Sequence, residues 1–148
     1  MAELPRHHRV RYDFEILDTF SAGVALLGTE VKALRGGQGK LEGSYVVIRG
    51  GEAYLVGASI PPFQKANAPK EYDPERSRRL LLLPKEIAEL ELKSERQGLT
   101  IVPLKWYNKG PSLKLEIAIA RGKKKADKRH SIKARDVARD LAREHRAR

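Results

Sequence analysis

The stretch LKLEIAI, Leu113 to Ile119, has the clearest alternation of apolar and charged residues in the chain. Every second residue in it is a large aliphatic one, and Lys114 and Glu116 fall between them. A period of two places the aliphatic side chains on one face of an extended strand and the charged ones on the other. We therefore expect a half-buried β-strand here.

Similar patterns upstream predict further short strands. Leu99–Tyr107 predicts a strand in which Pro103, having no N–H, requires an edge position or a bulge. Ser44–Ile48 and Ala53–Val56 predict two strands joined by a two-residue hairpin turn at Gly50-Gly51.

The remaining segments predict two more strands and two short helices. Arg11–Leu17 alternates and predicts a strand that ends in a turn at Phe20–Gly23. Leu80–Leu83 predicts a short buried strand, with Leu81 in the core. One helix is expected from an N-cap at Thr29 to Gly36-Gly37, and another from Pro84 to Gly98.

Six or seven short strands, joined mostly by tight turns, favour a mainly β fold. We predict an OB-like closed antiparallel β-barrel with two or three short helices, because a parallel sheet would need more crossover helices. The barrel is expected to occupy residues 1–121 and a basic C-terminal tail residues 122–148.

The charge of the chain is concentrated in that tail. Residues 122–148 hold 11 Lys and Arg against 4 Asp and Glu, so they carry +7 of the total charge of +11. A pI near 10 indicates a polyanionic partner, nucleic acid before an anionic membrane. Ser131 predicts a helix N-cap, but the apolar stripe that follows is thin. We expect the tail to be disordered when free and helical on a partner.

The composition excludes several kinds of chemistry. The absence of cysteine excludes disulfides, Cys-ligated metals and thiol catalysis. His7 and His8 are adjacent, so their side chains point apart on an extended chain, and we expect them to be satisfied surface residues. No HxxxH or P-loop spacing occurs. Trp106 and Tyr107, beside Lys105, predict a base-stacking platform with at most one free ring. These features favour a binding module without metal or cofactor over an enzyme.

The hydropathy of the sequence indicates where in the cell the protein is expected. No apolar run approaches the length of a membrane helix, and the N-terminal residues have no signal-peptide hydrophobic region. We expect a cytoplasmic protein that does not bind membranes.

Four separated motifs together resemble one known family. LLGTEVKALRGG (26–37), DPERSRRLLL (73–82), GLTIVPLKWY (98–107) and RGKKKADKR (121–129) are similar to the SsrA-binding protein family, also called small protein B. The resemblance spans nearly the whole chain and implies an OB-like barrel with a basic tail. It implies binding of a monomer to the tRNA-like domain of transfer-messenger RNA (tmRNA). It also implies delivery of alanylated tmRNA, with elongation factor Tu, to stalled ribosomes for rescue and tagging of the nascent peptide.

The resemblance also implies the residues that contact RNA. For the barrel they are Glu30, Lys32, Arg35, Arg76, Arg78, Lys105, Lys114, Gly122, Lys123 and Lys124. For the tail, which would reach the ribosomal decoding centre and message channel, they are Asp127, Lys128, Arg129, Ile132 and Lys133. Glu30 has an equally good alternative role as a carboxylate favoured by the helix dipole.

Three positions depart from the family pattern. Many members have Asn near His7, an acidic residue at Ser21, and an aromatic residue or His at Ala126. The last departure removes a stacking group before DKR, and if the family's tail stacks on a ribosomal base there, His130 is a candidate substitute.

Two other functions compete with this interpretation. A ribosomal or other structural RNA-binding protein would use the tail to thread rRNA and would be indifferent to tRNA shape. An RNA-processing enzyme would release RNA fragments in a reaction dependent on His7 or His8.

Overall fold

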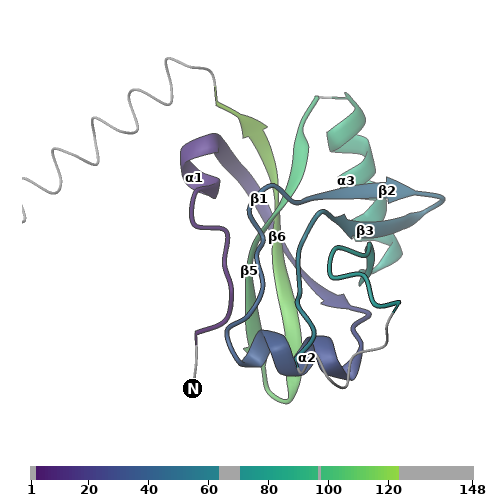
Figure 1. The fold of residues 1–148 in the computed structure, drawn as a ribbon. Coiled ribbons are helices and arrows are strands. Elements are labelled where there is room, and N and C mark those ends of the chain that lie inside the picture. Colours follow the sequence, from purple (N-terminus) through teal and green to yellow (C-terminus); the bar gives the residue numbers. More distant parts are fainter. Residues whose placement is uncertain (1–2, 64–70, 97, 124–148) are drawn as a thin grey trace, which may run out of the picture.

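The computed structural model describes residues 3–63, 71–96 and 98–123, and it forms a closed antiparallel barrel (Figure 1). The strand order is β1-β4-β3-β2-β5-β6. The bounds are β1 Phe14–Val24, β2 Tyr45–Arg49, β3 Glu52–Val56, β4 Arg78–Leu81, β5 Thr100–Lys109 and β6 Ser112–Gly122. The prediction of a mainly β, closed antiparallel barrel is confirmed.

Three long strands, β5, β6 and β1, form a continuous ribbon with β6 in the middle. β6 pairs with β1 from Gly122 to Lys114 and with β5 along nearly its whole length. The register of β5 shifts between Pro103 and Lys105, so of the two possibilities expected from the proline, an edge position or a bulge, the structure has the bulge. By contrast, β2 meets β5 at a single residue pair and β1 meets β4 at two. The ribbon is therefore the broadest paired surface of the barrel.

The β2–β3 hairpin turns as the sequence predicts. Arg49 pairs with Glu52, leaving Gly50 and Gly51 as the two turn residues, with φ of 57° and 77°. A two-residue turn with positive φ at both positions matches the twist of the flanking strands, and glycine adopts it without steric cost.

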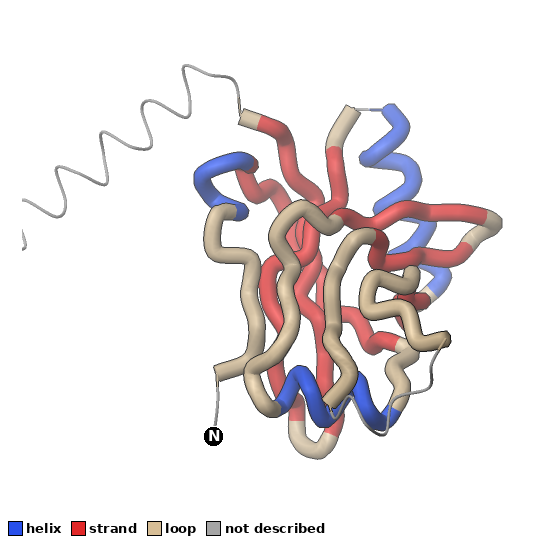
Figure 2. The backbone as a smooth tube through the Cα atoms, in the orientation of Figure 1, coloured by secondary structure: helices blue, strands red, loops and turns tan. Residues whose placement is uncertain are grey.

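In the described part of the chain, three helices accompany the barrel: α1 Val10–Asp13, α2 Gly28–Arg35 and α3 Pro84–Arg96. Figure 2 shows α2 crossing the end of the barrel near the β5–β6 turn, and α3 near the β2–β3 hairpin. α3 begins at Pro84 as expected. α2 starts at Gly28, before the Thr29 cap that the sequence predicts, because Glu30 accepts the Leu27 N–H and caps the helix instead.

The prediction of a strand over Arg11–Leu17 is wrong in its first half. Val10–Asp13 is helical, and β1 then runs without a turn through Phe20–Gly23, where the sequence predicts one. The reason is tertiary: β6 is eleven residues long and supplies a partner for β1 throughout. The β1 pairing shifts register between Ile16 and Asp18, and the chain bends there instead.

The assignment of Leu81 to the core is also wrong. β4 begins at Arg78, so Leu80 points inward and Leu81 outward, with 53% of Leu81 exposed. Leu83, just beyond the strand, is 56% exposed. A four-residue apolar run gives no period from which the inward side could be chosen.

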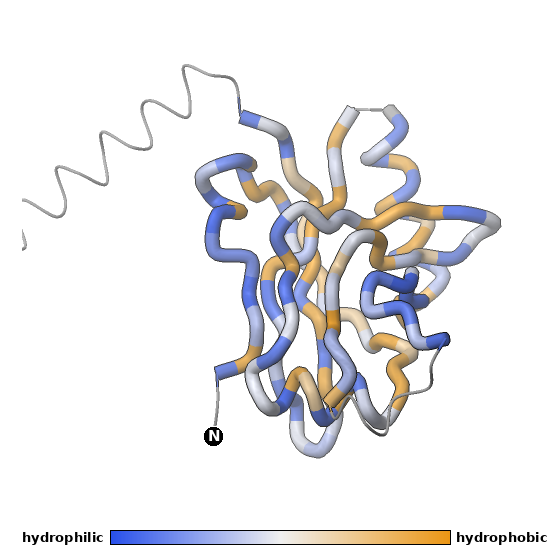
Figure 3. The backbone as a smooth tube through the Cα atoms, in the orientation of Figure 1, coloured by the Kyte–Doolittle hydropathy of each residue, from blue (hydrophilic) through white to orange (hydrophobic). Residues whose placement is uncertain are grey.

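Apolar residues recur along the strands of the ribbon (Figure 3), and their buried side chains form two separate clusters. The main core lies inside the barrel and contains Leu34 of α2, Leu55, Leu115 and Ile117. A smaller core lies on the outer side, where Val10 of α1 covers the outward residues of β5 and β6. Its other members are Val102, Leu104, Ala118 and Ala120. The N-terminal segment is thus a structural layer of the barrel.

We predict that Ile117→Ala lowers the free energy of unfolding by about 2–5 kcal/mol, because it leaves a cavity inside the barrel. Leu83→Ala removes an exposed side chain and should change it by less than about 0.5 kcal/mol. Urea titration of both variants measures the difference. Equal losses would contradict the assignment of Ile117 to the main core.

Candidate nucleic-acid interface

A buried ionic cluster connects α2 to the segment before β4. The Glu30 carboxylate is 0% exposed and accepts the Leu27 N–H at 2.8 Å. Arg76 Nε donates to its Oε2 at 3.0 Å, and Arg76 Nη2 donates to its Oε1. Arg78 Nε donates to Oε2 at 2.8 Å. One carboxylate therefore holds two arginines from a distant part of the chain.

Arg78 uses every donor it has. Its side chain is 0% exposed, and all five N–H groups of its guanidinium have partners. Besides Glu30, these partners are the carbonyl oxygens of Ala58, Pro74 and Arg76 and the Tyr72 hydroxyl. A guanidinium used in this way holds backbone segments together.

Tyr72 completes the cluster. Its hydroxyl donates to the Ile60 carbonyl at 2.8 Å and lies 3.0 Å from Glu30 Oε2. Sequence reasoning missed this residue. The available signal was its position one residue before the DPERSRR motif, but nothing in the pattern shows that it would face Glu30.

The ionisation of Glu30 follows from these contacts. Burial alone would raise the pKa of the Glu30 carboxyl. The hydrogen bonds from Arg76, the Leu27 N–H and Arg78, together with the Arg78 charge, outweigh burial and hold that pKa below its usual value. Glu30 is therefore an anion at neutral pH, and it faces arginines instead of solvent. Of the cluster's two arginines, Arg76 is the one that reaches the surface, with 30% of its side chain exposed.

The outer face of the ribbon carries the next group of predicted residues. Lys105 and Tyr107 of β5 point outward beside Glu116 and Lys114 of β6, since Lys105 pairs with Glu116 and Tyr107 with Lys114. We call these four residues the ribbon face. Trp106, between the first two, is 3% exposed and points inward, so the ring that remains at the surface is Tyr107, whose hydroxyl is hydrogen-bonded to Ser21.

The N-terminal segment extends the ribbon face by one strand position. Arg6 forms an isolated antiparallel bridge with Lys105, and the Trp106 N–H donates to the Pro5 carbonyl at 3.1 Å. Two cations thus lie directly opposite each other, an arrangement that is unfavourable without an anion between them. Arg6, His8, Arg11, Lys105 and Glu116 line a cleft of about 380 Å³.

At the other end of the ribbon face, Lys114 lies over Gly23 of β1. A Cβ at Gly23 would be 3.5 Å from Lys114 Nζ. Lys114 lines a second cleft, of about 570 Å³, together with Arg79 and the exposed Leu81 and Leu83. Lys114 and Lys105 have no carboxylate within ion-pair distance among the described residues.

The remaining predicted residues of the barrel that the structure describes lie on α2 and at the end of β6, outside the ribbon face. Lys32 and Arg35 are exposed on α2, and Arg35 Nη2 donates to the Pro111 carbonyl at 2.8 Å. Gly122 ends β6 opposite Phe14. The Lys123 N–H donates to the Asp13 carbonyl at 2.9 Å, and its Nζ donates to the Arg11 carbonyl at 2.7 Å.

The other predicted residues lie outside the described residues. These are Lys124 and the tail residues Asp127, Lys128, Arg129, Ile132 and Lys133. The predicted tail helix and the position of Ala126 lie there too.

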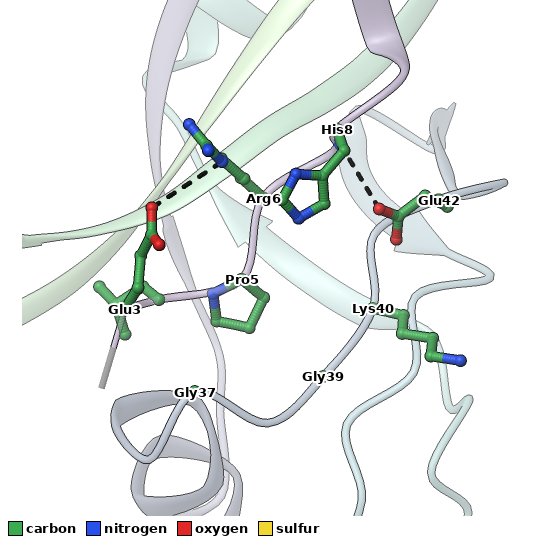
Figure 4. A pocket seen from close by; sticks show the side chains of 9 residues that line it. Glu3, Pro5, Arg6, His8, Gly37, Gly39, Lys40 and Glu42 are labelled. Carbon is green, nitrogen blue, oxygen red and sulfur yellow. Dashed lines mark hydrogen bonds and ion pairs between the residues drawn. The ribbon is translucent and has the colours of Figure 1, made fainter.

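The two N-terminal histidines differ in environment. His7 is 7% exposed and its Nδ1–H donates to the Pro103 carbonyl at 3.2 Å, so its expected surface position is wrong. His8 is exposed, and its N–H donates to Glu42 Oε1 at 3.4 Å, beside a cavity of about 460 Å³ (Figure 4). That cavity carries both signs of charge, from Glu3, Arg6, Lys40 and Glu42.

Membrane-spanning helices and metal clusters are both absent from the described part of the chain. No helix in it has the length and apolarity needed to cross a bilayer. No group of three or more His, Asp or Glu side chains in it is arranged to hold a metal ion.

Comparisons with known proteins agree on one family. The model of the SmpB protein family matches residues 5–147. An SsrA-binding protein of Oleidesulfovibrio alaskensis is 48% identical over 143 residues, which cover 97% of this chain and 92% of that protein. An SsrA-binding protein of Microcystis aeruginosa is 47% identical over 93% of this chain and 89% of its own length. A solved structure described as "tmRNA-SmpB: a journey to the center of the bacterial ribosome" superposes with a TM-score of 0.69 at 44% identity. The match covers 84% of this chain and 87% of that one.

We predict that Glu30→Gln lowers the free energy of unfolding at neutral pH by about 3–5 kcal/mol, because it leaves two arginines without their buried anion. Since the folded-state pKa of Glu30 is lowered, its ionised form stabilises the fold above the unfolded-state pKa of about 4.3. That stabilisation is lost as the pH falls from there through the folded-state pKa. The variant should therefore lose less stability on acidification.

Chemical denaturation between about pH 3 and about pH 7 measures both effects. Glu75→Gln, which alters an exposed carboxylate in the same segment, is the matched control and should behave as wild type. If Glu30→Gln kept the acid sensitivity of the wild type, the ionic cluster would not be its source.

Proposed function

The chain belongs to the SmpB protein family of SsrA-binding proteins, and from that premise we propose that its barrel recognises the tRNA-like domain of tmRNA through the ribbon face. Members of this family are non-enzymatic RNA-binding proteins that partner tmRNA in trans-translation at the ribosome. The proposal concerns which surface and which part of each partner are used.

The cations of the ribbon face carry the proposal. Lys105 and Lys114 lie on the same side of the ribbon. Arg6 stands directly beside Lys105, so two like charges face each other, although Arg6 also forms an exposed ion pair with Glu3 at 3.9 Å. A phosphodiester between them would relieve that repulsion and release counterions from the RNA. The RNA backbone is thus the partner that this charge pattern favours.

Shape selectivity is supported by the rigidity of the same surface. The two lysines start from neighbouring strands of the paired ribbon, so the spacing between their backbone positions is fixed. Phosphate contacts at fixed spacing set the position of a folded RNA without reading its sequence. The half-buried Tyr107 ring and the exposed Leu81, beside the two lysines, add apolar surface against which a splayed base can pack.

The exposed cations of α2 and Arg76 extend this footprint. Lys32 and Arg35 are at the surface, and Arg76 is partly so. Glu30 and Arg78 act instead as supports that hold Arg76 and β4 in place, since neither is exposed. Gly122 and Lys123 mark the point at which the chain leaves the barrel.

The tail acts after tmRNA has been bound. Its +7 charge suits a channel walled by RNA, where affinity is independent of sequence. Asp127, Lys128 and Arg129, with Ile132 and Lys133, are the residues we place at the decoding centre. Lys124 continues the basic surface from Lys123. The protein works as a cytoplasmic monomer, bound to alanylated tmRNA that elongation factor Tu delivers.

We predict that the double variant Lys105→Ala/Lys114→Ala binds the tRNA-like domain more weakly. The slope of log affinity against log salt concentration should fall by roughly one for each phosphate that the variant no longer neutralises. Fluorescence anisotropy over a salt series measures both. The matched control is Lys40→Ala/Lys85→Ala, which removes the same charge from two exposed lysines that are not part of the ribbon face. Equal weakening by both pairs would show that only net charge matters.

A second prediction separates the tail from the barrel. Lys128→Ala/Arg129→Ala should abolish peptide tagging in a reconstituted translation reaction while binding of the tRNA-like domain stays near the wild-type value. Loss of both activities together would refute separate roles. Tight binding to ribosomes without tmRNA, with no preference for the tRNA-like domain, would favour a structural ribosomal protein instead.

A further inference from the structure

We propose that, in the protein without RNA, the basic tail of residues 124–148 docks on an exposed face of α3. This face consists of Ala88, Glu91, Leu92 and Glu95, and we call it the α3 patch. The four residues follow the spacing i, i+3, i+4 and i+7, so their side chains are neighbours on one side of the helix. The inference concerns the protein before it meets RNA and goes beyond the proposed function.

The apolar part of the α3 patch has no cover from the barrel. Leu90 is 0% exposed and belongs to the main core, so α3 packs on the barrel through that side. Leu92 is 48% exposed, and Ala88, one turn before it, is exposed too. A single exposed leucine is common on protein surfaces, so the choice of its partner depends on the charges around it.

Those charges are negative. Glu95 is exposed and Glu91 half-buried, and among the described residues neither has a cationic side chain within ion-pair distance. Glu89, by contrast, is paired with Lys93 at 2.9 Å. A face with two carboxylates repels RNA and attracts a cationic segment. The α3 patch therefore favours a partner opposite in charge to that of the ribbon face.

The tail is a cationic segment that begins close to α3. Residues 124–148 hold ten Lys and Arg against four Asp and Glu, a net charge of +6. Figure 1 shows the end of β6 and the end of α3 at the same end of the barrel. Gly122 pairs with Phe14 of β1, and Asp18, about 13 Å further along β1, is ion-paired with Lys93 of α3 at 3.6 Å. Twenty-five residues span up to about 80–90 Å when extended, so the tail can reach the whole α3 patch.

The sequence of the tail has side chains that suit both parts of the α3 patch. Arg135, Arg139 and Arg143 recur every four residues, as the two carboxylates of the patch do. A guanidinium can hold a carboxylate through two parallel hydrogen bonds. Val137 and Leu141 are also four apart, as are the two apolar residues of the patch. A second copy of the same face would instead bring two further carboxylates, so the tail is the better occupant.

The contact is weak by itself and is favoured by the covalent connection. Exposed ion pairs stabilise little and are screened by salt. A segment on a short flexible linker, however, has an effective concentration of about 1 mM at its site. The docked tail then competes with RNA for the same arginines. The α3 patch thereby reduces sequence-independent binding of the tail to RNA, and a polyanion of higher charge density displaces the tail.

The first experiment measures the contact in the full-length protein by NMR. Because the chain has no cysteine, Ala142→Cys carries a single nitroxide spin label in the tail of ¹⁵N-labelled protein. We expect the amide signals around Leu92 to broaden at low salt. They should recover at about 1 M salt, where the screening length is about 3 Å. Gly110, in the β5–β6 turn, is the reference signal.

Two variants remove the contact, and each has a matched control. Glu91→Gln/Glu95→Gln and Leu92→Ala should each reduce the broadening on α3 to half or less of its size in the labelled parent. Glu71→Gln/Glu75→Gln removes the same charge from exposed carboxylates before β4 and should leave the broadening unchanged. Leu27→Ala, which removes a leucine that is 47% exposed, should do the same. Thermal unfolding of each variant confirms that it is folded.

The second readout is the affinity of the full chain, without a spin label, for an unstructured RNA strand at low salt. Glu91→Gln/Glu95→Gln should bind about twofold to fivefold more tightly than Glu71→Gln/Glu75→Gln, the factor for a tail docked in about half to four-fifths of the free molecules. Since both variants have the same net charge, a difference between them reports the α3 patch alone.

The inference is overturned if the α3 signals are not broadened at low salt, or if Glu91→Gln/Glu95→Gln leaves the broadening intact. Equal RNA affinity of the two glutamine variants would also overturn it. Mixing ¹⁵N-labelled protein that has no spin label with spin-labelled protein that has no ¹⁵N tests for a second copy. Broadening of equal size in that mixture would show that the tail docks on another molecule, which contradicts docking within one chain.

Discussion

The buried ion pair of Glu30 with Arg76 and Arg78 is the constraint on which the arrangement of this molecule depends. The carboxylate comes from the first turn of α2, and the arginines come from a segment more than forty residues later. Arg78 then binds the carbonyl groups of Ala58 and Pro74, on either side of a long connection. Removing a charged group from water is costly unless its partners are present, so the loss of one member leaves the others buried at a cost of several kcal/mol. The cluster fixes where β4 enters the barrel.

The placement of β4 determines which side chains face outward near β1. With Arg78 turned inward, Leu80 is buried and Leu81 exposed, and Leu81 then lies in the cleft with Lys114. The motif DPERSRRLLL thus contains both the arginines that hold β4 in place and the exposed Leu81 of the cleft beside Lys114. A basic protein can in this way use two of its arginines for structure and still present lysines to RNA.

The barrel could be predicted from the sequence where local rules decide the structure. Strict alternation located β6, two glycines located the β2–β3 turn, and Pro103 marked the irregular position of β5 as an edge or a bulge. The rules failed where partners distant in sequence decide. Val10 packs on the outside of the ribbon, a contact that the local pattern does not indicate, and the Val10–Asp13 segment is helical there. The pairing with β6 carries β1 through an expected turn.

Resemblance identified the interface motifs but not the role of each residue within them. Charge and motif alone do not distinguish Arg78, which is buried, from Arg76, which reaches the surface. The position of Tyr72 next to the DPERSRR motif gave no indication that its hydroxyl would face Glu30, because hydrogen bonding between distant segments depends on the folded chain. The ribbon face itself became visible only when the register placed Lys105 and Lys114 on the same side.

Selection of the RNA by the barrel, with the tail acting later on the ribosome, is the central claim. The most direct test compares the full chain with a truncation after Lys123, which retains all six strands, for binding to three RNAs over a salt series. The RNAs are the tRNA-like domain of tmRNA, an elongator tRNA and an unstructured strand. We expect the folded truncation to keep a clear preference for the tRNA-like domain. If all three bind alike and affinity collapses without the tail, the protein reads charge alone and selection by the barrel is contradicted.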